Sequence, residues 1–268
     1  MSRANKRILV IGMSGIIGGL VGRKLAEQCE VRALNRSRVR EVEWFAGDIA
    51  DLEAIQPAFA DVDTVVNMAG HMPEGGGSTA TAAEDVEGYI STNVIGARNV
   101  YEAAKRAGVK RVVFASAGAS VFNYVNEEPY LSLAEARWED LPQDVSRLNH
   151  LAPYRPNGIY GASKAWGEVL GRYYSNQHGI SVICVRVGHV PHPPQTERDL
   201  SAYQASIYCS HRDIVQFFER CVDAPDNLRY EIFFASSNNR GLFRDIEHPR
   251  KLIGYVPQDG IKDWPLRP

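Results

Sequence analysis

The stretch 6–18, KRILVIGMSGIIG, decides the fold of this chain. Its first half, Lys6–Ile11, is a short aliphatic run that predicts a buried strand, and helical spacing of apolar residues follows from Leu20 to Cys29. Between them, one glycine permits a tight turn, a second lets the backbone approach a pyrophosphate, and a third packs helix against strand. Free amides at the start of the helix bind phosphate. We therefore expect a dinucleotide phosphate site at Gly12, Ser14, Gly15, Ile16, Ile17 and Gly18.

Further short apolar runs follow along the chain and alternate with helical patterns. The expected strands are Glu30–Leu34, Val42–Ala46, Asp63–Ala69, Arg111–Ala115 and Ile180–Val187, and the expected long helices are Ala83–Ala107 and Ala162–Gln177. Continuous apolar strands that alternate with helices are typical of a parallel sheet covered on both faces. The sequence predicts an α/β protein: a Rossmann-type doubly wound parallel sheet with a small C-terminal substrate lobe.

The alternation weakens after Val187, where three prolines open an irregular stretch. A helix at His211–Val222 and one strand at Tyr230–Ala235 are expected beyond it. We predict a dinucleotide-binding domain over residues 1–187, which carries the catalytic residues, and a mainly substrate-binding lobe over residues 188–268, integrated with the first. The three consecutive glycines at Gly75–Gly77 predict a mobile surface loop.

Composition excludes several classes of protein. A chain of 268 residues suits one large domain with an appended lobe, and its net charge of -2 comes from well-mixed acids and bases, so nucleic acid is not an expected partner. The four cysteines show no metal-ligand spacing and no signal peptide precedes the first strand, which favours a reduced, cytoplasmic protein without a metal site. No apolar run approaches the ~20 residues needed to cross a bilayer.

The segment Asn35-Arg36-Ser37-Arg38 bears on the choice of cofactor. At the end of the second strand of such folds, an acid bonds the ribose 2′-hydroxyl of NAD, whereas an arginine nearby accommodates the 2′-phosphate of NADP. With no acid and two arginines, this segment favours NADP over NAD; the alternative is that the arginines are simply solvated. After the third strand, Asp48 and Ile49 reach the adenine in one interpretation, while Asp48 caps the helix that starts near Asp51 in the other.

Tyr160 and Lys164 stand one turn apart on one face of a predicted helix. A free tyrosine has a pKa near ~10, and it must fall by ~2–3 units, or ~3–4 kcal/mol, for the side chain to act as a base near neutral pH. An adjacent ammonium supplies that stabilisation. The pair therefore predicts proton transfer beside a nicotinamide, between the fifth and sixth strands.

With these motifs in this order, the chain resembles the short-chain dehydrogenase/reductase superfamily, in its extended branch of NAD-dependent epimerases and dehydratases, over nearly its whole length. The resemblance implies that Tyr160 accepts the proton and that Lys164 also contacts the nicotinamide ribose. It also implies cofactor contacts at Met68, Ala69 and Gly70 after the fourth strand, at Asn93 in the long helix, and at Val187, Gly188 and Val190 after the sixth strand.

Within this branch the chain looks similar to uronate dehydrogenases. The matching stretches are residues 155–168 (RPNGIYGASKAWGE), 210–213 (SHRD), 235–241 (ASSNNRG) and 252–255 (LIGY). In those enzymes an arginine after the sixth strand binds the substrate carboxylate, and Arg198 occupies the comparable place. His71 and His189 lie near the expected substrate pocket; for each, an ordinary loop histidine is the alternative.

Two positions depart from the family pattern. Ala117 stands where the family has its catalytic serine or threonine, so the hydroxyl must come from Ser120, which we prefer, or from Ser116. A hydroxyl donor of this kind contributes ~10²–10³ in rate. The second departure is Asn35, where the uronate enzymes carry the acid typical of NAD binding.

These patterns predict an NAD(P)-dependent oxidoreductase that transfers hydride between nicotinamide and a sugar-like or uronic acid alcohol or carbonyl. A nucleotide-sugar epimerase or dehydratase is one alternative, and a non-catalytic NADP-binding redox sensor is another. The expected partners are a small-molecule substrate and a second copy of the chain, which pairs through the helices at Ala83–Ala107 and Ala162–Gln177.

Overall fold

The computed structural model describes residues 6–72, 85–193 and 195–263. Within them, seven strands form one sheet in the order β3-β2-β1-β4-β5-β6-β7, and every neighbouring pair is parallel. The strands are β1 (Arg7–Ile11), β2 (Glu30–Asn35), β3 (Glu43–Ala46), β4 (Thr64–Asn67), β5 (Arg111–Ala117), β6 (Ser181–Val187) and β7 (Tyr230–Ala235). The predicted doubly wound parallel sheet is confirmed, with the strand order reversing between β1 and β4.

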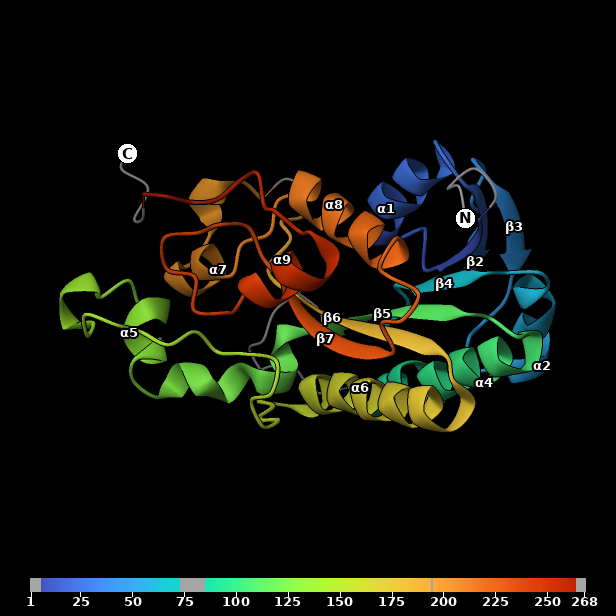
Figure 1. Cartoon of the computed structure of the whole chain (residues 1–268), viewed down its shortest axis with the longest axis horizontal. Coiled ribbons are helices and arrows are strands. Elements are labelled where there is room, and N and C mark those ends of the chain that lie inside the picture. The colour runs from blue at the N-terminus through green and yellow to red at the C-terminus, as the bar shows by residue number, and fades with distance from the viewer. Residues whose placement is uncertain (1–5, 73–84, 194, 264–268) are drawn as a thin grey trace.

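Helices cover both faces of the sheet (Figure 1). On one face lie α1 (Ile16–Ala26) and α8 (His211–Val222), and on the other lie α2 (Leu52–Ile55), η2 (Gln56–Phe59), α4 (Ala97–Ala107) and α6 (Ile159–His178). Successive residues of β1 alternate between the two resulting cores: Ile8 and Val10 join the α1/α8 core, while Leu9 and Ile11 join the α4/α6 core. Burial on both faces explains why the strands read as continuous apolar runs.

The long helix expected over Ala83–Ala107 is not uniform. Its described part begins with α3 (Val86–Gly88), continues as the π-helix η3 (Tyr89–Gly96) and ends with α4. π-helical turns widen the helix locally and occur frequently at functional sites. The change falls where this helix passes α6 and its catalytic candidates.

A small lobe extends beyond the carboxyl ends of β5, β6 and β7 (Figure 1). It contains η4 (Gly118–Asn126), α5 (Tyr130–Ala134), η5 (Trp138–Asp140), η6 (Glu197–Asp199) and α7 (Ala202–Ser206), in part around its own apolar cluster, whereas α9 (Glu247–Ile253) packs on β7. Two later elements, α8 and β7, instead continue the sheet and its helical layer. The lobe is therefore assembled from residues on both sides of position 187, and the domain division there stays a prediction.

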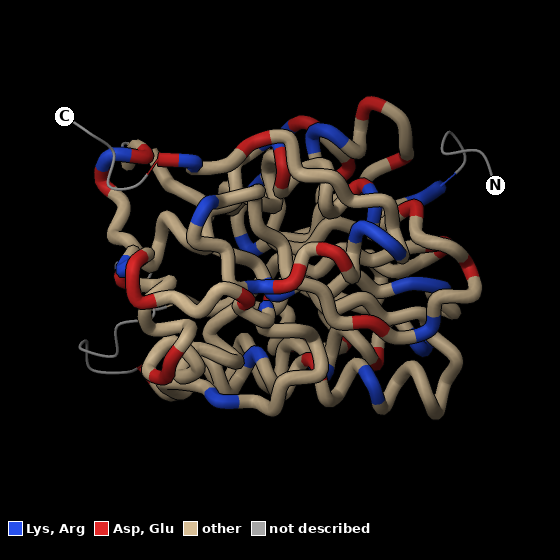
Figure 2. The backbone as a smooth tube through the Cα atoms, turned by 60° about the vertical axis from the view of Figure 1, so that its left-hand side comes forward, with Lys and Arg blue, Asp and Glu red and all other residues tan. Residues whose placement is uncertain are grey.

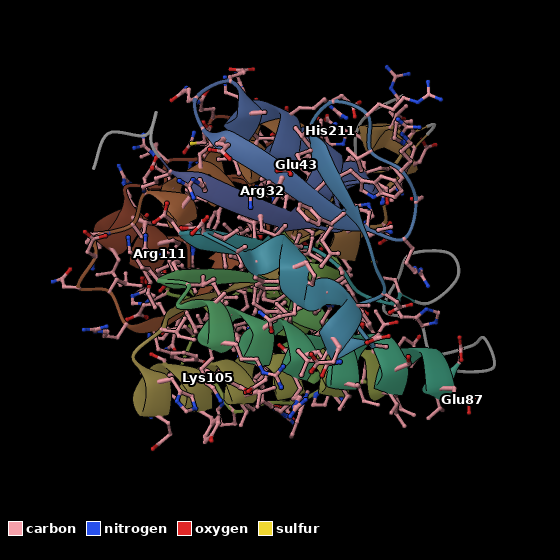
Figure 3. The ribbon with its side chains drawn as sticks, turned by 90° about the vertical axis from the view of Figure 1, so that its right-hand side faces the viewer. Arg32, Glu43, Glu87, Lys105, Arg111 and His211 are labelled. Atoms are coloured by element: carbon pink, nitrogen blue, oxygen red, sulfur yellow. The ribbon has the colours of Figure 1, made fainter. Side chains whose placement is uncertain are left out.

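The surface carries mixed charge. Figure 2 shows basic and acidic residues interspersed along the chain. At the edge of the sheet, Arg32 on β2 forms an ion pair of 2.8 Å with Glu43 on β3, directly opposite it in the register (Figure 3). Charges on an edge strand discourage pairing with another sheet. None of the described helices is long and apolar enough to cross a membrane, and Gly75–Gly77 lie outside the described residues.

Candidate active site

The phosphate loop between β1 and α1 has the geometry that its glycines predict. Gly12 has a φ of +87°, a conformation that side chains disfavour, and a Cβ there would lie 2.8 Å from the amide nitrogen of Ala69. A Cβ on Gly18 would lie 2.2 Å from the carbonyl oxygen of Gly12, so α1 packs directly on the turn. At Gly15 the nearest such atom is 3.4 Å away, which leaves that side of the loop open to a ligand.

Asn35, at the end of β2, holds this loop in place. Its side-chain oxygen accepts a hydrogen bond of 3.0 Å from the amide of Met13, and its Nδ2 donates one of 2.7 Å to Oγ of Ser14. Both hydrogen bonds are made by the neutral side-chain amide of Asn35. Asn35 is therefore a structural part of the loop as well as a neighbour of the expected ribose site.

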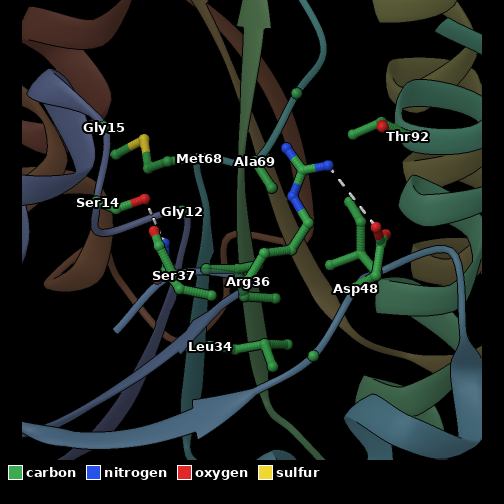
Figure 4. A pocket seen from close by; sticks show the side chains of 15 residues that line it. Gly12, Ser14, Gly15, Leu34, Arg36, Ser37, Asp48, Met68, Ala69 and Thr92 are labelled. Atoms are coloured by element: carbon green, nitrogen blue, oxygen red, sulfur yellow. Dashed lines mark hydrogen bonds and ion pairs between the residues drawn. The ribbon is translucent and has the colours of Figure 1, made fainter. Parts of the chain in front are cut away.

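A cavity of about 360 Å³ opens above the phosphate loop, at the reversal point of the strand order where such folds bind nucleotides (Figure 4). Most of its lining was predicted from the sequence: Gly12, Ser14, Gly15, Asn35, Arg36, Ser37, Asp48, Ile49, Met68, Ala69 and Gly70. Ile11, Leu34, Gly47 and Thr92 also line it and were missed. The glycine cradle and the size of the cavity fit the adenosine and phosphate part of a dinucleotide.

Other predicted cofactor residues do not line this cavity: Ile16, Ile17, Gly18, Asn93, Tyr160, Lys164, Val187, Gly188 and Val190. Ile16, Ile17 and Gly18 form the first turn of α1, directly after the loop. Of the rest, Asn93 lies on η3, Tyr160 and Lys164 lie on α6, and Val187, Gly188 and Val190 lie at the carboxyl end of β6, where the nicotinamide end of the cofactor is expected. Their cofactor roles stay predictions.

Arg36 projects at the rim of the cavity, and its side chain is 79% exposed. Its NH1 lies 3.8 Å from Oδ2 of Asp48, across the cavity mouth (Figure 4). Oδ1 of Asp48 accepts a hydrogen bond from the amide of Ala50, whereas the cap of α2 is Asp51, which accepts from two amides of the first turn. Capping is therefore the role of Asp51, and Asp48 is left facing the cavity.

Tyr160 and Lys164 lie on the face of α6 that packs against β5. Lys164 is buried, and its Nζ donates a hydrogen bond of 3.0 Å to the carbonyl oxygen of Ala115. The same Nζ lies 5.9 Å from the centre of the Tyr160 ring and 2.8 Å from where a Cβ on Gly70 would stand. The ammonium therefore fits beside Gly70 because Gly70 has no side chain. It lies between the cofactor cavity and the ring of Tyr160.

The pKa values of the pair move toward the uncharged forms. Burial lowers the pKa of Lys164 to about 8, with the charge of Glu168 opposing the change. Burial also raises the pKa of Tyr160 well above its usual range, and Tyr89 adds to the rise. The predicted lowering of the tyrosine pKa by Lys164 does not appear in these surroundings, because burial and Tyr89 both raise that pKa.

Tyr89, in the first turn of the π-helix, is a neighbour of Tyr160 that was not predicted from the sequence. The two ring centres are 6.1 Å apart, and the Tyr89 ring meets His71 edge-on at 5.1 Å. Asn93, one turn along, accepts from the amide of His71 at 2.7 Å and donates to its carbonyl at 3.0 Å. Asn93 thus positions the backbone that follows Gly70. The Nε2 atom of His71 lies 3.0 Å from Oδ2 of Asp85.

The two hydroxyls considered as replacements for the family serine at Ala117 point into the protein. Oγ of Ser116 donates to Glu168 at 2.5 Å, and Oγ of Ser120 donates to the carbonyl oxygen of Ala117 at 3.0 Å. Both side chains are buried. Geometry therefore lends no support to either as the substrate-facing hydroxyl, and their catalytic role stays a prediction.

The backbone amides that directly follow β6 form hydrogen bonds within the protein. The amide of Gly188 donates to Ala235, and the amide of His189 donates to Ile207. The His189 ring lies 3.1 Å from Gln195, and burial lowers its pKa. Arg198 is exposed on η6. A contact of His189 or Arg198 with substrate stays a prediction.

Comparison with known proteins assigns the chain to a family. Residues 8–213 match the model of the "NAD dependent epimerase/dehydratase family". The chain belongs to this family, and the match confirms the resemblance to the extended short-chain dehydrogenases/reductases.

Several relatives match over nearly the whole chain. An "NAD-dependent glucose-6-phosphate dehydrogenase" of Haloferax volcanii is 30% identical over 96% of this chain and 95% of its own length. A "Uronate dehydrogenase" of Pseudomonas putida is 31% identical, over 96% of this chain and 86% of the relative. Among solved structures, the crystal structure of uronate dehydrogenase from Agrobacterium tumefaciens superimposes with a TM-score of 0.74 at 28% identity, over 96% of this chain and 86% of that one.

Proposed function

We propose that this chain is an NAD(P)-dependent dehydrogenase that transfers hydride between a nicotinamide cofactor and a sugar-like alcohol or carbonyl, with aldoses and uronic acids as its first candidate substrates. The observation that carries this proposal is the junction at Lys164. Its ammonium contacts the edge of the dinucleotide cavity at Gly70 on one side and faces the ring of Tyr160 on the other. Two relatives that match over most of the chain are named as dehydrogenases of a sugar phosphate and of uronates.

In the proposed reaction, each residue near the nicotinamide has its own role. Tyr160 takes the proton of the substrate hydroxyl during oxidation and returns it during reduction. Lys164, one turn along α6, stabilises the phenolate that forms at Tyr160, while Asn93 and Gly70 hold the neighbouring backbone in place. The bound nicotinamide accepts or supplies the hydride. The net reaction converts alcohol and oxidised cofactor to carbonyl, reduced cofactor and one proton.

The cofactor preference that we propose is NADP. Asn35 presents no acid to a ribose 2′-hydroxyl, and the exposed Arg36 stands at the same rim with only a 3.8 Å contact to Asp48. A charge-assisted bond from Arg36 to a 2′-phosphate is worth ~1.5–3 kcal/mol, roughly a tenfold to hundredfold preference. NAD remains the alternative, since relatives carry it in their names.

The two alternative functions have less support. An epimerase or dehydratase of this branch encloses a nucleotide, and the lobe of this chain is small. A redox sensor has no chemical need for a buried lysine beside a half-buried tyrosine, and holding Lys164 in place costs stability because burial lowers its pKa. An enzyme that needs Lys164 for proton transfer is expected to tolerate this loss of stability.

The experiment that tests the proposed function compares Tyr160→Phe with wild type in the reduction of NADP and NAD by galacturonate, glucuronate, glucose and arabinose. We expect the variant to bind cofactor normally and to lose ~10²–10⁴ in kcat, because proton transfer is removed while the ring remains. Tyr173→Phe, on the exposed side of the same helix, is the matched control. Wild-type protein that turns over none of these sugars, or a Tyr160→Phe variant that keeps its rate, would refute the proposal.

We also propose that the protein is a homodimer. Large apolar side chains are exposed along the outer faces of η3 and α6: Ile90, Ile95, Trp166, Val169 and Tyr173. These two helices lie side by side and were expected to pair with a second copy. Large apolar side chains that are exposed on adjacent helices are typical of such an interface.

A further inference from the structure

Arg244 follows β7 and α7 in the lobe, and it is 1% exposed. Its guanidinium lies 5.6 Å from the ring centre of Phe234 and 5.5 Å from that of Phe243. One nitrogen, NH2, donates a long hydrogen bond of 3.3 Å to the hydroxyl of Tyr203. The other two, Nε and NH1, have no hydrogen-bond partner among the described residues. Buried donors of this kind are rare and call for an acceptor.

The charge around Arg244 is not balanced either. Nearby, Arg186 on β6 forms a two-pronged ion pair with Glu168, with bonds of 2.9 and 2.8 Å between buried groups. That carboxylate is used by Arg186 and by Ser116, and within the described part of the chain the NH1 of Arg186 is also buried without a hydrogen-bond partner. Burial lowers the pKa of Arg244, and the charge of Arg186 adds to this effect. Glu168 therefore balances the charge of Arg186, and no carboxylate pairs with Arg244 among the described residues.

Arg244 reaches the end of β5, next to the catalytic candidates. A Cβ on Gly118 would lie 2.1 Å from NH2 of Arg244, so the guanidinium rests against the bare backbone that directly follows Ala117. One residue further, the carbonyl of Ala119 lies 2.4 Å from where a Cβ on Gly161 would stand, and Gly161 adjoins Tyr160. The backbone of Gly118 and Ala119 therefore lies between the guanidinium and the turn of α6 that carries Tyr160.

We propose that Arg244 binds an oxyanion, a carboxylate or a phosphate ester, carried by the substrate whose hydroxyl is oxidised at Tyr160. A planar guanidinium with Nε and a terminal nitrogen free is suited to hold an oxyanion through two parallel bonds. This assignment rests on the proposed dehydrogenase function and places the substrate anchor at Arg244, where sequence reasoning had placed it at Arg198.

The test uses sugars that differ only in their charged group: glucose, glucuronate and glucose 6-phosphate, and galactose with galacturonate. We expect wild type to favour an anionic member over its neutral partner by at least tenfold in kcat/KM. In Arg244→Met, KM for the anionic sugar rises by roughly 30-fold or more, while the neutral sugar and the cofactor are handled as before. Arg250→Met, which removes an exposed arginine from α9, is the control and keeps the wild-type ratio.

A second variant covers the case in which Arg244→Met fails to fold. Gly118→Ala places a methyl group in the position of the guanidinium and displaces it without changing any charge. It is expected to lose the same preference for anionic sugars. The proposal is overturned if the preference survives in both variants, or if wild type treats charged and neutral sugars alike.

Inorganic phosphate separates a substrate-borne group from a free ion. If Arg244 holds the charged group of the substrate, phosphate competes with anionic sugars and raises the melting temperature of wild type but not of Arg244→Met. Stabilisation by phosphate that depends on Arg244 without such competition would mean a resident free anion and would overturn the substrate assignment. Failure of the dehydrogenase function is distinct, because no sugar, charged or neutral, would then be oxidised.

Discussion

The ammonium of Lys164 and the carbonyl oxygen of Ala115 are 3.0 Å apart, and this bond ties the catalytic helix α6 to the central strand β5. The bond forms in a buried place, where a carbonyl dipole compensates only part of the lost hydration of a charge. The same burial brings the pKa of Lys164 down to about 8. Lys164 is thus expected to destabilise the fold that positions it.

The first prediction concerns Lys164→Met. Because the folded-state pKa lies below the usual 10.5, folding is penalised wherever the lysine must stay charged, which is below about pH 8. The penalty falls as pH rises from about 8 to 10.5, where the unfolded chain still binds the proton that the folded protein has released. We expect the methionine variant to be more stable at pH 7 by up to about 3 kcal/mol and to be inactive.

Chemical denaturation between pH 6 and pH 10.5 checks this prediction. The stability difference between wild type and Lys164→Met should shrink as pH rises through that window. A variant that is less stable than wild type at pH 7 would show that the bond to Ala115 outweighs the desolvation of the ammonium.

A second prediction addresses cofactor choice through Arg36. We expect Arg36→Ala to weaken NADPH binding by roughly tenfold to a hundredfold and to leave NADH binding nearly unchanged, since only NADPH carries a 2′-phosphate. Fluorescence titration of both cofactors measures this. Arg40→Ala, an exposed arginine of the same loop, is the control. Equal losses for the two cofactors would assign Arg36 a general role in binding and remove the argument for NADP.

Two glycines of the phosphate loop should separate folding from binding. A Cβ on Gly18 would meet the Gly12 carbonyl at 2.2 Å, so Gly18→Ala should destabilise the protein by ~1–3 kcal/mol. Gly15 has a φ of −77° and its nearest atom at 3.4 Å, so Gly15→Ala should fold normally yet bind cofactor weakly, because the methyl group projects toward the phosphates. Melting temperatures and cofactor titration of both variants distinguish these effects, and a Gly15→Ala protein that binds normally would contradict the assignment of the loop.

The proposed dimer can be tested at Val169, which is exposed on α6. We expect Val169→Glu to convert a dimer to a monomer, since two like charges would face each other across a two-fold axis. Light scattering coupled to gel filtration gives the mass of each species. Val256→Glu, at an exposed apolar residue of the lobe, is the control and should not change the mass. Wild type that elutes as a monomer would dismiss the dimer.

Much of the fold was predictable because its signals are local. His211–Val222 and Tyr230–Ala235 agree with the structure residue for residue, and the helix with Tyr160 and Lys164 begins only three residues earlier than expected. Helical and strand periodicities record which face is buried, so they survive in a single sequence. The π-helix η3 was not predictable, since its extra width per turn arises from packing rather than from composition.

The sequence by itself determined the parallel sheet, the glycine loop at Gly12–Gly18 and the spacing of Tyr160 from Lys164, because each depends on residues that lie within about a turn or a strand of one another. The tertiary structure alone decided what surrounds them. It brought Tyr89 against Tyr160, turned the hydroxyls of Ser116 and Ser120 into the protein, and placed Arg244 on the bare backbone of Gly118. Those contacts join segments far apart in the chain, and the burial that they create sets the charges and pKa values on which the chemistry depends.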